Sequence, residues 1–276
     1  MRIDGKKIAE GIRKGLHKQI GDLIAKGITP KIAIITLGDE SSWENYVRQK
    51  LRVAGELGIK AVLLNLEDAN ENLLLKTIHE IDADPKYHGI IVQRPMPNSI
   101  DKDKVINSIS PEKDVDGFRP DSKFEVPVWM AVRKILESAI QNPTRPEPSW
   151  DSLNFVVLGK GETAGGPIAR GLAKMGIEPQ IIDTQTKNQN EILKNADVII
   201  SCVGKSEVVN GENIKPGSVV IGVGTHTENG KLKGDFEEIQ VESISKAFTP
   251  TPGGVGPVNL SFLFTNLVKA AENNVE

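Results

Sequence analysis

The chain has 276 residues, which is enough for two medium α/β domains and too many for one small module. Its 34 basic and 37 acidic residues give a formal net charge of −3, which argues against nucleic acid or a membrane surface as a partner, because such binders need a basic excess. A single cysteine excludes a disulfide framework, the four histidines lack metal-ligand spacing, and no apolar run approaches the ~20 residues of a membrane span, so we expect a soluble, cytoplasmic protein without a metal site.

Helices alternate with strands through the first half of the chain. Hydrophobic residues make up 38% of the sequence and aromatic residues only 4%, so the core is expected to be aliphatic, as suits parallel strands covered by helices. The predicted elements are a helix over 8–25, a strand over 31–38, a helix over 42–58, a strand over 60–66, a helix over 70–81 and a strand over 89–95. This order predicts parallel βαβ units with right-handed crossovers.

A proline-rich segment interrupts the alternation at residues 141–152, and we interpret it as a linker between two domains. The same order of elements then restarts, with strands over 154–159, 179–183, 197–204 and 218–224 and helices over 163–175, 188–195 and 258–272. The predicted fold class is therefore α/β, with two domains that are each built on parallel strands.

The segment VVLGKGETAGGP (156–167) stands where a predicted strand passes into a helix. It fits the pattern G-x-G-x-x-G/A at Gly159, Gly161 and Ala164. The first glycine permits a tight turn, the second lets the backbone approach a pyrophosphate, and a small residue at the third position allows close helix–strand packing, while the helix N-terminus adds N–H donors. This context favours a Rossmann-like dinucleotide site; a glycine turn that binds no ligand is the alternative.

Two charged residues near this turn give opposite indications of the cofactor. Asp183 ends the next predicted strand, where an acidic side chain binds the ribose 2′-OH of NAD and repels the extra phosphate of NADP. An aspartate that merely opens a loop is an equal alternative. Lys160, inside the turn, favours NADP because a cation there can meet the 2′-phosphate. The choice between the two cofactors stays open at this point.

Three further motifs lie in the first half of the chain. Tyr46 and Lys50 are four residues apart and share a face of the predicted helix, although a solvated charged face is the ordinary interpretation. VQRPMP (92–97) follows the end of an apolar strand, where open parallel sheets place ligand sites. DVDGF (114–118) is an acidic turn, for which a plain loop is the ordinary interpretation.

Four segments occur in order at a recognisable spacing: YVRQK (46–50), GIIVQRPMP (89–97), PEKDVDGF (111–118) and TPTPGGVGP (249–257). Together with IDGKKIA (3–9) and the run at 215–235, they resemble the bifunctional methylenetetrahydrofolate dehydrogenase/methenyltetrahydrofolate cyclohydrolase family over nearly the whole chain. The resemblance implies oxidation of 5,10-methylenetetrahydrofolate by hydride transfer to NADP, and hydrolysis of the methenyl product to 10-formyltetrahydrofolate in one-carbon metabolism. It also implies a homodimer.

The resemblance further implies a division into domains. Residues 1–142 with 256–276 would form a small βα folate-binding catalytic domain, and residues 143–255 would form a Rossmann-like dinucleotide-binding domain. The last helix would return to the first domain, and the active site would lie in the cleft between the two.

The resemblance also assigns roles to individual residues. Lys50 is the cyclohydrolase residue, which handles protons as water adds to the methenyl bridge. Tyr46 stacks near the folate, Gln93 holds the lysine by a hydrogen bond, and Asp116 accepts from the pterin ring. The folate pocket is further lined by Val92, Pro252, Gly253, Gly254, Gly256 and Pro257. The candidate cofactor residues, most of which come from the glycine turn and the strand end rather than from the resemblance, are Gly159, Lys160, Gly161, Asp183, Thr184 and Thr225.

The chain departs from the family pattern at several positions. Trp43 stands where Ser is usual, Arg94 where Leu is usual, and VPVWMA (126–131) where P-C-T-P is usual. Most other departures cluster around the cofactor, and with Asp183 they leave NAD open as a cofactor beside NADP. The remaining alternatives are a monofunctional dehydrogenase or cyclohydrolase, and a catalytically silent nucleotide-binding protein of the same fold.

Overall fold

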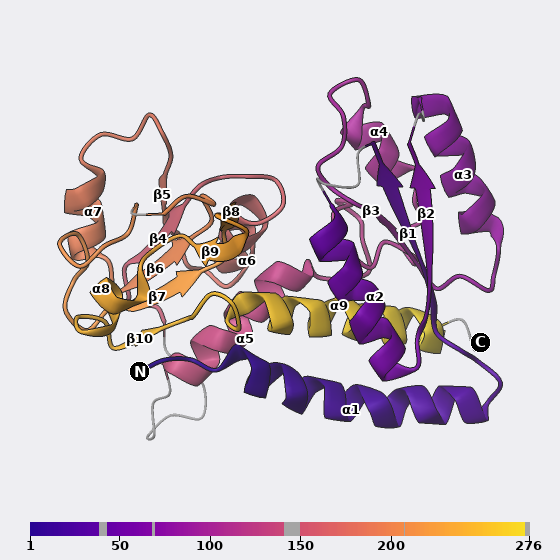
Figure 1. Ribbon diagram of the computed structural model, residues 1–276, viewed down its shortest axis with the longest axis horizontal. Coiled ribbons are helices and arrows are strands. Elements are labelled where there is room, and N and C mark those ends of the chain that lie inside the picture. Colours follow the sequence, from indigo (N-terminus) through magenta and orange to yellow (C-terminus); the bar gives the residue numbers. More distant parts are fainter. Residues whose placement is uncertain (39–42, 68–69, 141–149, 207, 274–276) are drawn as a thin grey trace. The chain divides into compact units, whose positions relative to one another are not determined.

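The computed structural model describes residues 1–38, 43–67, 70–140, 150–206 and 208–273 (Figure 1). The chain divides into two compact units, which we name by their sheets. The five-stranded unit comprises Met1–Glu10 and Val128–Asn259, and the three-stranded unit comprises Gly11–Pro127 and Leu260–Glu276. Helices α1 (Gly5–Ala25) and α9 (Val255–Asn273) each begin in the five-stranded unit and continue into the three-stranded unit.

The three-stranded unit is built on a parallel sheet in the order β2-β1-β3. Its strands are β1 (Lys31–Leu37), β2 (Lys60–Leu66) and β3 (Gly89–Val92), and it also contains helices α2 (Glu44–Leu57), α3 (Glu71–Ala83) and α4 (Lys102–Asn107). Successive side chains of β1 point to opposite faces of the sheet. Ile32 belongs to a core shared with α1, α2 and α9, whereas Ala33 and Ile35 belong to a core shared with α3. Helices therefore cover both faces.

The last helix returns to this unit, as predicted. Phe264 and Leu267 of α9 share a core with Leu16 and Ile20 of α1, and Figure 1 shows the two helices side by side. Gly89 permits α9 to approach the sheet closely, because a Cβ at this position would lie 2.8 Å from Leu267 Cδ1.

The five-stranded unit contains a parallel sheet in the order β10-β7-β6-β4-β5. Its strands are β4 (Phe155–Leu158), β5 (Gln180–Ile182), β6 (Val198–Ser201), β7 (Val219–Gly222) and β10 (Ala247–Phe248), and its helices include α5 (Pro127–Ala139), α6 (Gly165–Lys174), α7 (Gln189–Asn195) and α8 (Glu238–Glu242). The chain runs from β4 outward to β5 and then returns past β4 to β6. Open parallel sheets bind ligands where the strand order reverses, so the glycine turn after β4 stands at the expected place.

The predicted α/β fold with two parallel sheets is confirmed, but several elements were not predicted. One is the hairpin of β8 (Thr225–Glu228) and β9 (Lys231–Gly234), which turns at Asn229 and Gly230 with φ of 50° and 72°. Asn-Gly is the sequence that such a tight hairpin turn favours, so the signal was present. Another is α5, which begins at Pro127, a residue suited to the first helical position. Helices α4 and α8 and strand β10 were also not predicted; each is too short to show a clear apolar period.

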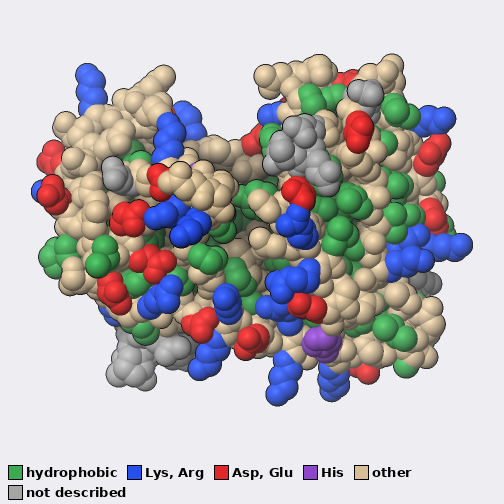
Figure 2. Space-filling model, viewed as in Figure 1, with side chains coloured by type: hydrophobic (Ala, Val, Ile, Leu, Met, Phe, Trp, Pro, Cys, Tyr) green, Lys and Arg blue, Asp and Glu red, His purple; other side chains and the backbone are tan. Residues whose placement is uncertain are grey.

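The predicted linker at 141–152 lies mostly outside the described residues, which resume at Trp150. The compact units divide between 127 and 128 and between 259 and 260, and the domain boundaries at 142 and 256 stay a prediction. Among the described residues, we find no helix that combines the length and apolar character of a membrane span, and no cluster of three side chains that could hold a metal ion. Basic and acidic side chains are interspersed over the face shown in Figure 2.

Candidate functional site

Helix α2 and the end of strand β3 bring Lys50 and Gln93 together. Lys50 Nζ donates a hydrogen bond to Gln93 Oε1 at 2.7 Å. Gln93 follows β3 directly, and its backbone N–H donates to Ile35 O of β1 at 2.8 Å. Its side-chain Nε2 donates to Arg94 O at 2.8 Å. The side-chain amide is therefore held by both of its polar atoms, with the carbonyl oxygen directed at the lysine.

The environment of Lys50 favours its neutral form. The side chain is half-buried, and loss of solvation lowers the pKa of its ammonium group below the usual range. The Asp116 carboxylate opposes this shift, because a nearby negative charge favours the protonated amine, but its effect on the pKa is the smaller of the two. At any pH near neutrality, Lys50 therefore has a larger neutral fraction than an ordinary lysine.

Asp116 is presented by a tightly fixed turn. Gly117 has a φ of +70°, and a Cβ there would lie 2.8 Å from Phe124 O, so both conformation and space require glycine. Its N–H donates to Asp114 O at 2.9 Å, and Asp114 Oδ2 accepts the N–H of Arg119 at 2.9 Å. Burial raises the pKa of Asp114 to about 6, and the charge of Asp116 adds to this shift.

Asn266 of α9 holds the same turn from the helix. Its side chain is buried, and Nδ2 donates to Val115 O and to Glu125 O, both at 2.9 Å. Sequence reasoning missed this residue. The available signal was an asparagine within the apolar pattern of the predicted helix over 258–272.

Replacing Asn266 with leucine is expected to lower the free energy of unfolding by about 2–4 kcal/mol, because two carbonyl groups lose their donor inside the protein. Urea unfolding monitored by circular dichroism measures the change. Thr265→Val is the matched control on the same helix: its hydroxyl donates only to Ser261 O of α9 at 3.0 Å, and a loss below about 1 kcal/mol is expected. Equal effects of the two substitutions would contradict the bridging role of Asn266.

A small cavity of about 20 Å³, roughly the space of one water molecule, lies beside Asp116. Arg94 and Phe118 form part of its wall, and the Arg94 guanidinium lies over the Phe118 ring at 4.2 Å from the centroid. The rest of the wall is mostly apolar: Ile90, Ile91, Val92, Met96, Val105, Ile106 and Ile109, with Asp114. The unusual Arg94 is thus accommodated by stacking on Phe118.

The other predicted residues of this unit differ in exposure. Tyr46 lies one turn before Lys50 on α2, and 54% of its surface is exposed. Val92 is the buried last residue of β3. Trp43 is buried beside Ile34 and Val47, so this departure from the family pattern is a core residue.

The turn between β4 and α6 has two different kinds of glycine. Gly159 has a φ of +86°, and a Cβ on Gly165 would collide with Gly159 O, so the backbones are in direct contact there. At Gly161, by contrast, a Cβ would have nothing within 4 Å, so open space lies in front of this residue. Close packing of backbones therefore requires glycine at Gly165, the first residue of α6, and the small residue at Ala164 stays a prediction; the helix begins two residues after its predicted start at 163.

Lys160 and Asp183 contact each other. Lys160 Nζ lies 2.8 Å from Asp183 Oδ2. Asp183 Oδ1 accepts the N–H of Gln185 and the hydroxyl of Thr186, both at 3.0 Å. These contacts, led by the bond from Lys160, lower the pKa of Asp183 to about 2. The two residues that gave opposite indications of the cofactor are an ion pair in the structure.

Thr184 and Thr225 are placed differently. Thr184 is exposed and follows Asp183 directly, whereas Thr225 is half-buried at the start of β8. A Cβ at Gly204 would lie 3.3 Å from Thr225 O, so β8 runs close to the loop that follows β6. Sequence reasoning missed Asp235, a buried carboxylate that accepts the N–H groups of Gly204 at 2.7 Å and Gly224 at 3.1 Å. Asp235 thereby ties together the loops that follow β6 and β7.

The segment that contains Pro252, Gly253, Gly254, Gly256 and Pro257 leads into α9. Gly253 has a φ of +105°, and a Cβ at Gly254 would lie 2.5 Å from Pro250 O. A side chain at Gly5 would in turn collide with Gly254 O. The backbone therefore requires glycine at 253 for its conformation and at 254 for lack of space. At Gly256, by contrast, a Cβ would have nothing within 4 Å.

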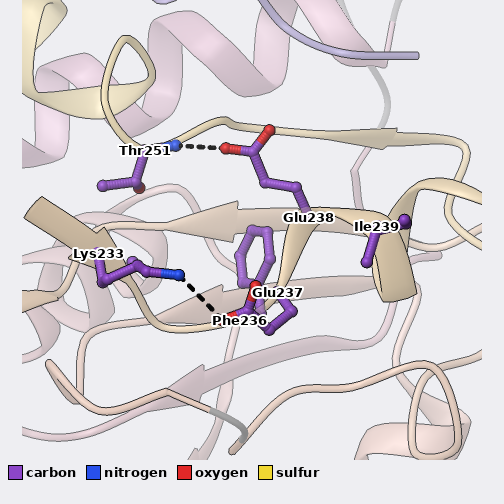
Figure 3. A pocket seen from close by; sticks show the side chains of 7 residues that line it. Lys233, Phe236, Glu237, Glu238, Ile239 and Thr251 are labelled. Carbon is purple, nitrogen blue, oxygen red and sulfur yellow. Dashed lines mark hydrogen bonds and ion pairs between the residues drawn. The ribbon is translucent and has the colours of Figure 1, made fainter. Parts of the chain in front are cut away.

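A cavity of about 210 Å³ lies beside this segment and is lined by residues of β9 and α8 (Figure 3). Glu238 Oε1 accepts the N–H of Thr251 at 3.0 Å, and Lys233 pairs with Glu237 at 3.4 Å. Arg2 pairs with the second carboxylate oxygen of Glu238 at 3.1 Å. The charged groups of this cavity are thus engaged with one another and with the backbone, and Glu238 holds the residue that precedes Pro252.

The predicted site residues fall into three groups. Lys50, Gln93 and Asp116 lie together in the three-stranded unit, with Tyr46 and Val92 on the same elements. In the five-stranded unit, one group surrounds the turn after β4, and the other is the segment from Pro252 to Pro257.

Two family models match the chain. The catalytic-domain model of tetrahydrofolate dehydrogenase/cyclohydrolase matches residues 3–116, and the NAD(P)-binding-domain model of the same enzymes matches residues 142–275. A bifunctional protein FolD from Staphylococcus epidermidis is 37% identical over 279 aligned residues, which cover 97% of this chain and 95% of that protein.

Solved structures give the same result. The bifunctional FolD methylenetetrahydrofolate dehydrogenase/cyclohydrolase of Campylobacter jejuni is 31% identical and superposes with a TM-score of 0.90 over 99% of each chain. The Trypanosoma brucei dehydrogenase-cyclohydrolase, in complex with NADP and an inhibitor, is 28% identical, with a TM-score of 0.91 over 100% of this chain and 98% of that one.

Proposed function

The chain belongs to the tetrahydrofolate dehydrogenase/cyclohydrolase family, and from this premise we propose which of its residues carry the two reactions. It oxidises 5,10-methylenetetrahydrofolate to 5,10-methenyltetrahydrofolate with NADP as the hydride acceptor, and it hydrolyses the methenyl product to 10-formyltetrahydrofolate. The observation that carries our assignment of the second reaction is the 2.7 Å hydrogen bond between Lys50 and Gln93.

We assign the proton transfers of the hydrolysis to Lys50. The methenyl carbon is already cationic, so the demanding part of the reaction is the movement of protons. As the water oxygen bonds to this carbon, the neutral Lys50 amine accepts a proton from the water. The bond from the carbon to N5 then breaks, N5 takes up the proton from Lys50, and the hydroxyl proton leaves to solvent. One proton is released per turnover, and burial of Lys50 supplies the neutral amine.

The neighbours of Lys50 orient the lysine and the substrate. Gln93 accepts from Nζ and thereby fixes where the amine lies. We assign Asp116 to the N–H groups of the pterin ring, because an ionised carboxylate accepts but does not donate hydrogen bonds. Tyr46 offers an exposed aromatic face one turn from the lysine, and Val92 offers an apolar contact at the end of β3.

Replacing Gln93 with methionine, which has similar size but no strong acceptor, tests this assignment. Methenyl hydrolysis is expected to fall about 10- to 100-fold, because Lys50 loses the group that positions it, while hydride transfer changes less than about threefold. Absorbance assays on the methenyl and methylene substrates measure both rates. Gln49→Met is the control: it makes the same change at an exposed position of α2, next to Lys50. A Gln93 role limited to folding would lower both rates together and leave the pH profile of hydrolysis unchanged, which would contradict the assignment.

The residues after β4 fit the dinucleotide. Open space in front of Gly161 leaves room for the pyrophosphate, and the ten-residue helix α6, whose N-terminus carries the positive end of the helix dipole, begins four residues later. We propose that Gly159, Gly161 and this end of α6 surround the pyrophosphate, and that Lys160, Asp183 and Thr184 face the adenosine ribose. NADP supplies the hydride acceptor when it is bound.

We assign the remaining residues of the five-stranded unit to the reacting rings. Thr225 is proposed as a cofactor contact beside the loop after β6. The residues Pro252, Gly253, Gly254, Gly256 and Pro257 are proposed to line the folate and nicotinamide side. The proposed domains are 1–142 with 256–276 for folate and 143–255 for the dinucleotide; the family-model matches at 3–116 and 142–275 support a boundary near residue 142, and the return of 256–276 to the folate domain is supported by the packing of α9 against α1. We also propose that the enzyme works in the cytoplasm, which fractionation of cells would test.

We propose that the chain is a homodimer that associates through its five-stranded unit. Ile239 of α8 is 80% exposed and Leu232 of β9 is 43% exposed, so both offer apolar surface to a second copy of the chain. The double variant Leu232→Asp/Ile239→Asp is expected to be monomeric by light scattering during gel filtration, where the unsubstituted chain is a dimer. Leu73→Asp, at a 47% exposed position of α3, is the control and is expected to stay dimeric. A double variant that remains dimeric would contradict this interface.

A further inference from the structure

The ion pair of Lys160 with Asp183 is asymmetric. The Lys160 side chain is 72% exposed, and a long exposed lysine can change its partner at little cost. The Asp183 side chain is only 25% exposed, and Gln185 and Thr186 hold its Oδ1 atom. The carboxylate is therefore held in place just after β5 by two further hydrogen bonds, whereas the Lys160 ammonium is exposed and contacts Asp183.

Each partner of the pair suits a different adenosine ribose. A carboxylate at the end of this strand accepts hydrogen bonds from an unmodified ribose, and it repels a phosphate on the 2′ oxygen. A lysine beside it attracts that phosphate. In this chain the two groups that would bind the ligand are hydrogen-bonded to each other instead. Lys160 Nζ donates to Asp183 Oδ2 at 2.8 Å.

We propose that the Lys160–Asp183 pair is a charge switch that sets the preference of the enzyme between a 2′-phosphorylated and a 2′-hydroxyl adenosine ribose. For the phosphorylated ligand, Lys160 leaves Asp183 and binds the phosphate, while the carboxylate behind it weakens that binding. For the hydroxyl ligand, Asp183 accepts from the ribose and Lys160 stays nearby. The pair therefore holds the preference for NADP below the value that Lys160 alone would give, and NAD binds measurably as well. This inference rests on the proposed dinucleotide site after β4.

The switch is not set by the protonation of Asp183 under ordinary conditions. Its pKa of about 2 keeps the carboxylate charged near neutral pH, so its repulsion of a 2′-phosphate is constant there. A phosphate monoester gains most of its second negative charge near pH 6, so the ligand itself titrates there. Binding measurements therefore belong at pH 7.5, where both charges are complete.

Titration calorimetry with 2′,5′-ADP and 5′-AMP tests the switch without any reaction, because the two ligands differ only in the 2′-phosphate. Asp183→Asn keeps the oxygen that accepts from Gln185 and removes the charge. It is expected to tighten 2′,5′-ADP about tenfold and to weaken 5′-AMP about threefold or more, because the amide nitrogen that replaces Oδ2 cannot accept a hydrogen bond from the ribose. Lys160→Gln is expected to weaken 2′,5′-ADP about tenfold and to leave 5′-AMP within threefold. Lys187→Gln, an exposed lysine of the same segment, is the control for general charge effects and is expected to change neither ligand more than threefold.

An unchanged ratio of the two dissociation constants in Asp183→Asn would overturn the switch. So would a loss of 2′,5′-ADP affinity in Lys187→Gln as large as that in Lys160→Gln. If neither ligand binds the unsubstituted chain, the dinucleotide site itself fails, and that result is separate from a failure of the switch. Thermal melts of each variant show that a change in affinity does not come from unfolding.

Discussion

Replacing Lys50 with methionine is expected to lower the rate of methenyl hydrolysis by about 10³-fold, which lies within the usual contribution of a general base. The substitution keeps the length and apolar stem of the side chain and removes the amine that accepts the proton of water. Hydride transfer is expected to stay within about fivefold, because it depends on how the two rings are oriented rather than on a proton carrier. Absorbance assays of both reactions on one preparation give the ratio directly.

Lys50→Arg separates the charge of the lysine from its basicity. Arginine keeps the positive charge and the hydrogen-bonding capacity toward Gln93, but it stays protonated at every accessible pH and cannot accept the proton of water. Hydrolysis is therefore expected to fall about as far as in Lys50→Met. Near-normal hydrolysis in Lys50→Arg would mean that the lysine acts as a fixed charge, and the proposed proton transfer would be wrong.

The second large effect is expected at the glycine turn. Gly165→Ala should lower the free energy of unfolding by about 3 kcal/mol or more, because the added Cβ collides with the backbone oxygen of Gly159, which cannot move aside as a flexible side chain would. Denaturant unfolding monitored by circular dichroism measures this loss.

Gly161→Ala is the matched variant of the same turn. A Cβ there meets open space, so the free energy of unfolding should change by less than about 1 kcal/mol. NADP affinity should nevertheless fall by at least about tenfold, because the methyl group occupies the space proposed for the pyrophosphate. Normal NADP binding by Gly161→Ala, or normal stability of Gly165→Ala, would contradict the roles given to these two glycines.

Much of the fold follows from local pattern. The apolar run that became β1 and the periodic helix that became α9 were predicted because their side chains repeat at the spacing of a buried strand and an amphipathic helix. The hairpin that turns at Asn229 and Gly230 was not predicted, although Asn-Gly is typical of such turns. Neither of its short strands, THTE and KLKG, has the apolar pattern by which strands were identified. Local pattern finds elements that bury apolar side chains more readily than it finds exposed ones.

The site was less accessible to such reasoning. Lys50 and Gln93 are 43 positions apart, and only the parallel pairing of β3 with β1 places the residue after β3 beside α2. Their roles came from the resemblance to a family and not from composition or spacing. Asn266 was missed because its two acceptors are carbonyl groups of a distant turn, which no local pattern reveals. Lys160 and Asp183 indicated different cofactors in the sequence. The structure shows that they form an ion pair, a contact between residues 23 positions apart that the sequence alone does not reveal.

The most direct test of the catalytic account is the pH dependence of kcat/KM for methenyl hydrolysis, measured for the unsubstituted chain and for Asp116→Asn. We expect the rate to rise with pH, as Lys50 loses its proton, and to level off at an apparent pKa below the usual range of lysine. Since the Asp116 carboxylate raises the pKa of Lys50, its removal should move the rise to lower pH. A rate that falls as the pH rises, or a profile that Asp116→Asn leaves in place, would contradict the assignment of proton transfer to Lys50.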